Sequence, residues 1–440
     1  MSPKSYPKPP PSSATAASLN DGALGVKSEL LLFISAVLVV AVYLDHGATA
    51  PMSAVALAAY VAAAEQVGNA SSLHAPGRRA RQIVEDARES IAAALGAHPS
   101  EVVFTHGGTE ANNLAIKGTF WGRQPKKRVL LSAIEHHSVL EPAQWLRDYQ
   151  GAQTEMIAVD KYGIVDLTAL AELIDDDVAL ISVMLANNEI GVIEPISEVV
   201  AIAKKYQIPV HTDAIAAASQ IPVNFDELGV DLLSVAGHKL GGPVSSGALL
   251  VKRTTPIQGL IQGGGQERNL RAGTLDVPAI AAFAAAVTVA VAELGAQATR
   301  LATLRDHLVQ GILATIPDVI LQGPPITPDS ACADVGNSTP AGVQAASPGR
   351  LPGNALLTFS GTNADTLLFL LDQAGIAASA GAACSAGVAE PSHVLLACGV
   401  SPEQARGALR LSLGPTTTQA EIDRVVEVLP NLVAQARKVG

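Results

Sequence analysis

The amino-acid sequence predicts an α/β protein built on a mostly parallel β-sheet. Short runs rich in Val, Ile and Leu alternate with segments of helical pattern from about residue 55 to residue 295. Strands that alternate with helices form parallel sheets whose two faces are covered by those helices. The chain has 440 residues, which is enough for two domains with large cores.

The expected strands are short apolar runs, and several are followed by polar residues. The runs lie at 101–105, 128–133, 179–184, 208–213, 231–236 and 247–251, with a helix expected at 196–206. The polar residues lie at 106–110, 135–137, 187–189, 213 and 238–239. Because ligands bind at the carboxyl ends of parallel strands, these residues predict one site at that edge of the sheet.

A second, smaller α/β region follows. A stretch dense in Pro, Gly, Ser and Asn, 327–354, reads as a loop. Helices are expected at 297–316, 364–374 and 418–438, and a strand at 355–360. We therefore divide the chain into an extension (1–42), a large domain (43–295, whose first segment also contributes to the small domain) and a small C-terminal domain (296–440).

Composition and cysteine usage narrow the class of protein. The net charge of −11 gives no reason to expect a nucleic-acid-binding surface. The three cysteines have no metal-ligand spacing and are too scattered for a disulfide framework, so we expect a reducing cytoplasm and no metal site. Cys398 lies in the apolar run VLLACGV and is expected in a core, whereas Cys332 lies in a polar, Pro-rich stretch.

The N-terminus carries an uncharged run, LLLFISAVLVVAVYL, at 30–44. A membrane span usually needs about 20 apolar residues, and this run passes directly into Asp45 without a signal-cleavage spacer. We interpret it as an apolar extension that leads into a buried strand. A misassigned start codon and a membrane anchor are the alternatives.

Lys239 and Asp213 have the properties of a pyridoxal phosphate (PLP) site. Lys239 follows a strand in GHKLGGP, where a lysine can hold a carbonyl cofactor as a Schiff base, although a surface turn is the simpler reading. Asp213 ends the apolar strand IPVHTD, where a carboxylate is costly unless paired, and the pyridinium N–H of PLP would pair it.

Three further stretches fit the same site. THGGTEANNLAIKG, at 105–118, places glycines before a helix start, which suits a phosphate. His136 in IEHHSVLEP could cover the ring of the cofactor. Cys384 lies in SAGAACSAGVAEPSHVL among small residues that offer a structural thiol little to pack against. It is either incidental in an alanine-rich chain or a nucleophile on a loop.

The ordered motifs resemble those of the PLP-dependent cysteine desulfurases of the NifS and IscS type, in the class V aminotransferase family. They are YLDHGATAP, GNASSLH, FTHGGTEANNLAIKG, EHHSVLEP, ANNEIGVIEPI, HTDA, GHKLGGP, GGGQERNLRAGT and GAACSAG…EPSHVL. The resemblance runs from about Tyr43 to the C-terminus. It implies a fold-type I PLP-dependent transferase, with a seven-stranded-type sheet in the large domain, a cysteine loop in the small domain, and a homodimer.

The resemblance also implies roles for individual residues. Lys239 would bind PLP, Asp213 its ring nitrogen, and His136 would stack on the ring and shuttle protons. Gly108, Thr109 and His238 would bind the phosphate of the cofactor, and Thr274 of the second subunit would bind the same phosphate. Asn188 would contact the phenolic oxygen of the cofactor and the substrate.

Substrate binding and sulfur transfer follow from the same resemblance. Arg410 in ARGALRLSLG would bind the substrate carboxylate, with Arg406 as the near competitor. Cys384 would take sulfur from L-cysteine as a persulfide, leaving L-alanine. The sulfur would pass to an acceptor protein, such as an iron–sulfur scaffold or a tRNA-thiolation enzyme. A selenocysteine lyase, another class V PLP enzyme and a catalytically weak sulfur-transfer scaffold are the alternatives.

Two departures from the family pattern predict weaker cofactor retention. Ala216 stands where relatives usually have Gln, and Ala236 where they have Ser or Thr. Each lost hydrogen bond costs about 1 kcal/mol.

Overall fold

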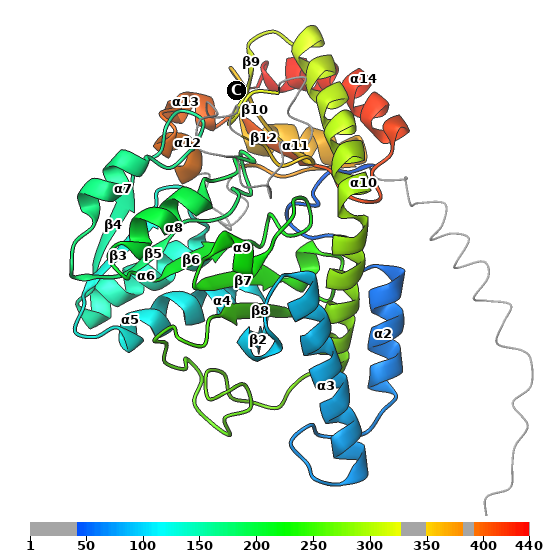
Figure 1. Ribbon diagram of the computed structural model, residues 1–440. Helices are drawn as coiled ribbons and strands as arrows, with labels where there is room; N and C mark the ends of the chain where they lie inside the picture. The colour runs from blue at the N-terminus through cyan, green and yellow to red at the C-terminus, as the bar shows by residue number, and fades with distance from the viewer. Residues whose placement is uncertain (1–41, 327–348, 382–390, 440) are drawn as a thin grey trace, which may run out of the picture. The chain divides into compact units, whose positions relative to one another are not determined.

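The computed structural model describes residues 42–326, 349–381 and 391–439. The described chain forms three sheets, of seven, three and two strands. Cys332, Cys384 and most of the apolar run at 30–44 lie outside the described residues. Figure 1 shows the seven-stranded sheet and the three-stranded sheet at opposite ends of the long helix α10 (Val277–Thr315).

The seven-stranded sheet confirms the predicted fold class. Its spatial order is β2-β8-β7-β6-β5-β3-β4, and every neighbouring pair is parallel except those of β8, which runs antiparallel to β2 and β7. The strands are β2 (Val102–Thr105), β3 (Arg128–Ser132), β4 (Gln153–Ile157), β5 (Val178–Ser182), β6 (Val210–Asp213), β7 (Leu232–Ala236) and β8 (Gly247–Val251).

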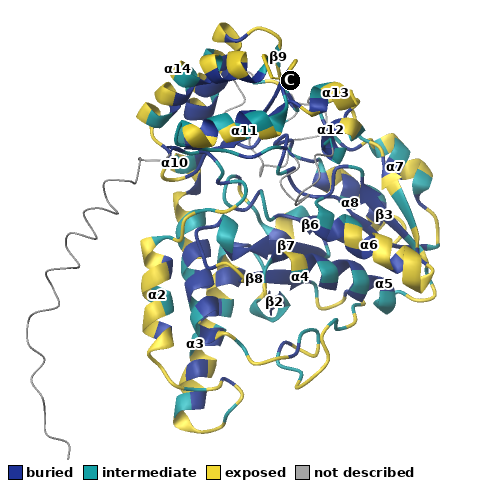
Figure 2. Cartoon of the chain, turned by 180° about the vertical axis from the view of Figure 1, so that it is seen from behind, coloured by how far each residue is buried: buried dark blue, intermediate teal, exposed yellow. Residues whose placement is uncertain are grey.

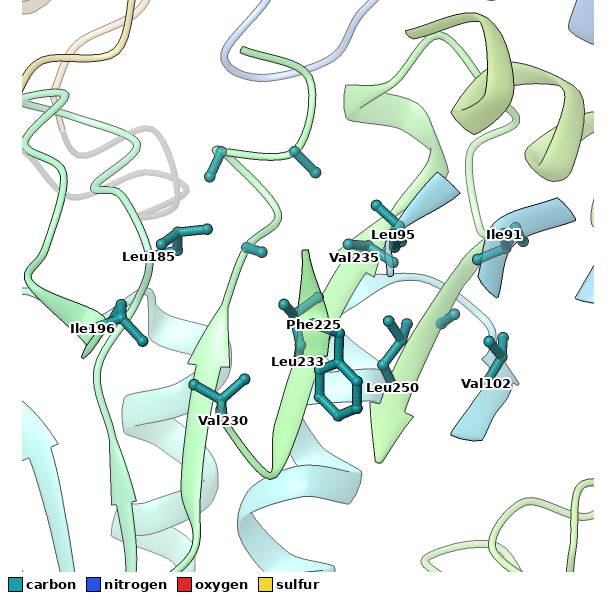
Figure 3. Packing of buried hydrophobic residues seen from close by; sticks show 14 of the residues in the cluster. Ile91, Leu95, Val102, Leu185, Ile196, Phe225, Val230, Leu233, Val235 and Leu250 are labelled. Carbon is teal, nitrogen blue, oxygen red and sulfur yellow. The ribbon is translucent and has the colours of Figure 1, made fainter. Parts of the chain in front are cut away.

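Successive residues along a strand point to opposite faces of the sheet. Both faces of this sheet belong to apolar cores, and helices cover both. Val102 and Leu250 belong to one apolar core, together with Phe225, while their chain neighbours Val103 and Leu249 belong to another. Figure 3 shows the first of these cores, with Leu233 and Leu250 near Phe225.

The covering helices and short helical turns are mostly connections between strands. They are α3 (Ala75–Ala94), η2 (Pro99–Glu101), α4 (Gly108–Asn113), η3 (Leu114–Gly118), α5 (Thr119–Gly122), α6 (His137–Gln150), α7 (Leu167–Leu173), α8 (Ile196–Lys204), α9 (Phe225–Leu228) and η4 (Gly237–Lys239). Figure 2 shows buried strands between helices such as α6 whose outer surfaces are exposed.

The helix α10 contributes to two cores. Its first part packs against α2 (Ala54–Ala64) and α3, and Phe283 lies in the core of the large sheet. Its second part packs against α14 (Gln419–Ala436), and Leu308 lies in the core of the small sheet. Within the described chain, α10 alone is long and apolar enough to cross a membrane, but half of its most apolar stretch is buried. We interpret it as a core helix.

The C-terminal region is built on the three-stranded antiparallel sheet, in the order β12-β10-β9. The short strand β1 (Val42–Tyr43) pairs in parallel with β11 (Ile376–Ala377), so the end of the apolar run forms a strand in which Val42 is buried and Tyr43 is partly buried. The other elements are β9 (Val319–Leu321), β10 (Asn354–Phe359), α11 (Ala364–Gln373), α12 (His393–Ala397), α13 (Pro402–Ala405) and β12 (Ala408–Ser412).

Candidate active site

One pocket, with a volume of about 290 Å³, gathers most of the predicted site residues. Those lining it are Gly108, Thr109, His136, Asn188, Asp213, His238, Lys239 and Arg410. Thr274 is exposed and is not among the described lining residues. Cys384 lies outside the described residues, although Gly381 lines the pocket. The predicted polar residues do not all reach it, because His106 is exposed and Glu110 pairs with Arg271 at 3.0 Å.

Lys239 reaches the pocket from η4, directly after β7. Its Nζ donates hydrogen bonds to the backbone oxygen of Gly47 and, at 2.8 Å, to that of Ala48. The first motif of the chain therefore holds the amine, which the sequence alone did not indicate.

Asp213 is a buried carboxylate at the carboxyl end of β6. Its Oδ2 accepts a hydrogen bond from Nδ2 of Asn112 at 2.7 Å, and its Oδ1 accepts one from the backbone N–H of Ile215 at 2.8 Å. Burial raises its pKa, while these hydrogen bonds and the charge of Lys239 oppose the rise. A cationic N–H in the pocket would pair this carboxylate.

Two glycines at the start of α4 bring the backbone of the chain close to the pocket. Gly107 has φ +100°, a conformation that favours glycine, and Gly108 begins the helix. A Cβ on Gly108 would lie only 2.2 Å from Cδ1 of Ile215, so this position cannot take a side chain without a shift. Thr109 and His238 complete this wall.

His136 is the N-cap residue of α6 and is held as a neutral imidazole. Burial first, and then the charge of Lys239, lower its pKa to about 4. Its Nδ1 accepts a hydrogen bond from the backbone N–H of Ser138 at 3.1 Å. The ring proton is therefore on Nε2.

Arg410 enters the pocket from β12 and is almost completely buried. Its Nη2 lies 3.0 Å from Oδ1 of Asp45, and its Nη1 donates to the backbone oxygen of Asn188 at 3.2 Å. Arg406 is exposed and does not line the pocket. The geometry therefore favours Arg410 over its competitor as the carboxylate-binding group.

Comparison with known proteins agrees with this arrangement. The family model for aminotransferase class-V matches residues 42–425. An IscS-like cysteine desulfurase of Mycobacterium tuberculosis is 48% identical over 90% of this chain and 98% of its own length. The chain belongs to the class-V aminotransferases, in their cysteine desulfurase branch.

Solved structures of this family share the fold. A NifS-like protein superposes with a TM-score of 0.79 at 33% identity, covering 90% of this chain and all of its own. The structure of SspA in complex with cysteine superposes with a TM-score of 0.70 at 30% identity, covering 86% of this chain and 99% of its own. The fold-type I architecture expected from the sequence is thus confirmed for this desulfurase-family chain.

The pocket of this class-V chain also contains two glutamates to which the sequence assigned no role. Glu135 is fully buried, and Oε1 accepts a hydrogen bond from the backbone N–H of Met184 at 2.6 Å. Burial and the nearby Asp213 raise its pKa well above the ordinary value. Glu189 accepts a hydrogen bond from Oγ of Ser392 at 2.5 Å, and burial raises its pKa to about 7. Both favour the neutral form more than a solvated glutamate does.

The two departures from the desulfurase pattern face the same pocket. Ala216 and Ala236 both line it, so each contributes a methyl group where the family resemblance led us to expect a hydrogen-bonding side chain. Cys398, in contrast, lies in an apolar core as predicted, where burial raises its pKa to about 12. Among the described residues, no cluster of three or more His, Cys, Asp or Glu could hold a metal.

The donor set fits PLP. The pocket combines an amine (Lys239), a buried carboxylate (Asp213), a neutral imidazole (His136) and a helix that begins at a glycine. These are the groups that a Schiff base, a pyridinium nitrogen, a ring face and a phosphate require.

Proposed function

We propose that this chain is a PLP-dependent desulfurase that converts L-cysteine to L-alanine and holds the sulfur as a persulfide on Cys384. The observation that carries the proposal is the convergence of Lys239, Asp213, His136 and Arg410 on one pocket. The relatives named cysteine desulfurase, and the related structure in complex with cysteine, support the choice of substrate.

PLP, when bound, withdraws electrons from the bonds at the α-carbon of the amino acid. Lys239 would hold it covalently, Asp213 would pair its ring nitrogen, and His136 would lie over its ring. Its phosphate would be bound by His238 and by the start of α4, at Gly108 and Thr109. Asn188 would approach its phenolic oxygen.

The protein groups would then divide the chemistry among themselves. The Arg410 fork binds the α-carboxylate and fixes the orientation of the substrate. Lys239 Nζ and His136 Nε2 hold and move protons in the pocket. The Cys384 thiolate forms a bond to the substrate sulfur, and the carbon–sulfur bond breaks with its electron pair on carbon. A proton then completes the methyl group of L-alanine.

We further propose a cytoplasmic homodimer in which Thr274 reaches the phosphate of a second copy. The exposure of Thr274 and its absence from the described lining of its own pocket support this role. The released sulfur would pass to an acceptor protein of iron–sulfur assembly or tRNA thiolation. We also propose that the large domain ends at residue 295 and the small domain begins at residue 296, so that α10 belongs to both domains.

Lys239→Ala tests the function directly. The purified wild type should show the visible absorbance band of lysine-bound PLP and release L-alanine and sulfide from L-cysteine. The variant should lose both the band and turnover, because no other group in the proposal can bind the cofactor covalently. Lys252→Ala, outside the pocket lining, should keep both. A Lys239→Ala protein that retains the band and turnover would refute the assignment.

A further inference from the structure

Arg410, the proposed carboxylate-binding residue, already has a carboxylate partner within the chain. Asp45 Oδ1 lies 3.0 Å from Nη2, and the two side chains are only 20% and 2% exposed. The same Oδ1 accepts a hydrogen bond from Oγ of Ser379 at 2.7 Å. This is therefore a partly buried, oriented ion pair, which is screened much less than a surface pair.

Arg410 nevertheless keeps donor capacity for a ligand. Its Nε is buried without a hydrogen-bond partner in the described part of the chain, so a ligand cannot reach that atom. Its Nη1 and Nη2 carry two N–H donors each, and the contacts to Asn188 and Asp45 use one donor from each. A substrate carboxylate can therefore bind beside Asp45 without displacing it.

The backbone that follows Asp45 is held by hydrogen bonds to Ser412 and to Lys239. The N–H of His46 donates to the Ser412 oxygen at 3.2 Å, and that of Gly47 donates to Ser412 Oγ at 2.7 Å. The oxygens of Gly47 and Ala48 accept from Lys239. Asp45 is thus held in one segment with the groups that orient both the lysine and the arginine of the pocket.

We propose that Asp45 is a positioning residue that sets the charge specificity of the site. It orients the Arg410 fork, and its negative charge makes the site favour amino acids with an uncharged side chain over those with a second carboxylate. This inference rests on the proposed function, because it requires Arg410 to bind the substrate carboxylate.

The physical reason is the balance of charge around Arg410. Asp45 offsets the positive charge of the guanidinium, so Arg410 offers little attraction to a second carboxylate beyond the α-carboxylate that it binds. L-Cysteine carries a mostly protonated thiol at neutral pH and escapes this repulsion.

The test compares two ligands that differ in one charge, L-aspartate and L-asparagine. Their dissociation constants from the PLP-loaded enzyme would be measured by calorimetry. The wild type should bind L-asparagine more tightly. Asp45→Asn keeps an oxygen that can accept from Arg410 and Ser379 but removes the charge. It should reduce the preference for L-asparagine by about tenfold.

Asp306→Asn is the matched control. Asp306 also pairs with a buried arginine, Arg305, at 2.7 Å, but neither residue lines the pocket. This variant loses the same charge and should keep the wild-type preference.

The outcomes separate this inference from the proposed function. An unchanged preference in folded Asp45→Asn would reduce Asp45 to a structural counter-ion and overturn the proposal. If that variant does not fold, the wild type alone decides, since equal affinity for the two ligands would also overturn it. Failure of the wild type to bind PLP or any amino acid would instead contradict the function itself.

Discussion

At the scale of single residues, the pocket keeps His136 and His238 neutral beside a lysine. Burial, and then the charge of Lys239, lower the pKa of both His136 and His238 to about 4. A solvated histidine has a pKa of about 6.5 and would be partly charged under mildly acidic conditions. The protein therefore adds two polar rings near Lys239 without adding two positive charges, and both rings are neutral at neutral pH.

Restoring side chains at Ala216 and Ala236 should strengthen cofactor binding. Both residues line the pocket, and each hydrogen bond regained should contribute about 1 kcal/mol. The double variant Ala216→Gln, Ala236→Ser should therefore lose PLP more slowly than the wild type. The measurement is the decay of the visible absorbance band during dialysis.

Ala58→Gln is the control for the added side chain. Ala58 is exposed on α2 and does not line the pocket, so this variant should lose PLP at the wild-type rate. An equal rate in the double variant would mean that other groups already satisfy the hydrogen-bonding atoms of the cofactor.

The sequence located the residues of the pocket better than it located their partners. Lys239 and Asp213 follow apolar strands, so local pattern and family motif together placed them at one sheet edge. Asn112 and Asp45 were missed as partners because their contacts join segments far apart in the chain. The first pairing depends on how α4 meets β6 and the second on how the first motif meets β12, which no local periodicity encodes.

At the scale of elements, α10 owes its length to packing along two cores. Phe283 and Leu308, on its two halves, lie in the cores of the large and small sheets. The sequence predicted only the part from residue 297, because the alanine- and valine-rich first part has no polar face to mark helical periodicity. The strand β4 was missed for a related reason. It lies at the sheet edge and only Ile157 of its five residues is buried, so the run QTEMI is not apolar.

Two glycines of α10 should respond oppositely to alanine. A Cβ at the exposed Gly295 would meet nothing within 4 Å, so Gly295→Ala should stabilise the protein by about 0.5–1 kcal/mol. A Cβ at Gly311 would lie 2.7 Å from Cγ1 of Val426 on α14, and overpacking costs about 1–3 kcal/mol. Gly311→Ala should therefore destabilise it.

Denaturant unfolding of the two variants checks this contrast, and each serves as the control for the other. Equal stabilisation by both would mean that α14 moves away from α10 at little cost.

At the scale of the whole molecule, buried acids and buried histidines impose opposite pH dependences on folding. Acids with a raised folded pKa lose their stabilising protonation as pH rises, whereas histidines with a lowered folded pKa destabilise the fold as pH falls. Glu194 is a buried acid that does not line the pocket. Burial raises its pKa from 4.5 to about 8, against a hydrogen bond that its Oε2 accepts from the backbone N–H of Val165 at 2.9 Å.

Glu194→Gln should therefore gain stability relative to the wild type as pH rises. Below pH 4.5 the carboxyl is protonated in both folded and unfolded chains, and between pH 4.5 and about 8 only the folded chain keeps its proton. Wild-type stability then falls by up to about 1.4 kcal/mol per pH unit from this one group, while glutamine has no proton to lose.

Urea unfolding of both proteins at pH 5 to 8 would measure the difference, with the exposed Glu198→Gln as the control for a lost carboxylate. A difference that stays constant across this range would show that Glu194 is ionised in the folded protein, and that its buried charge is compensated by a group other than Val165.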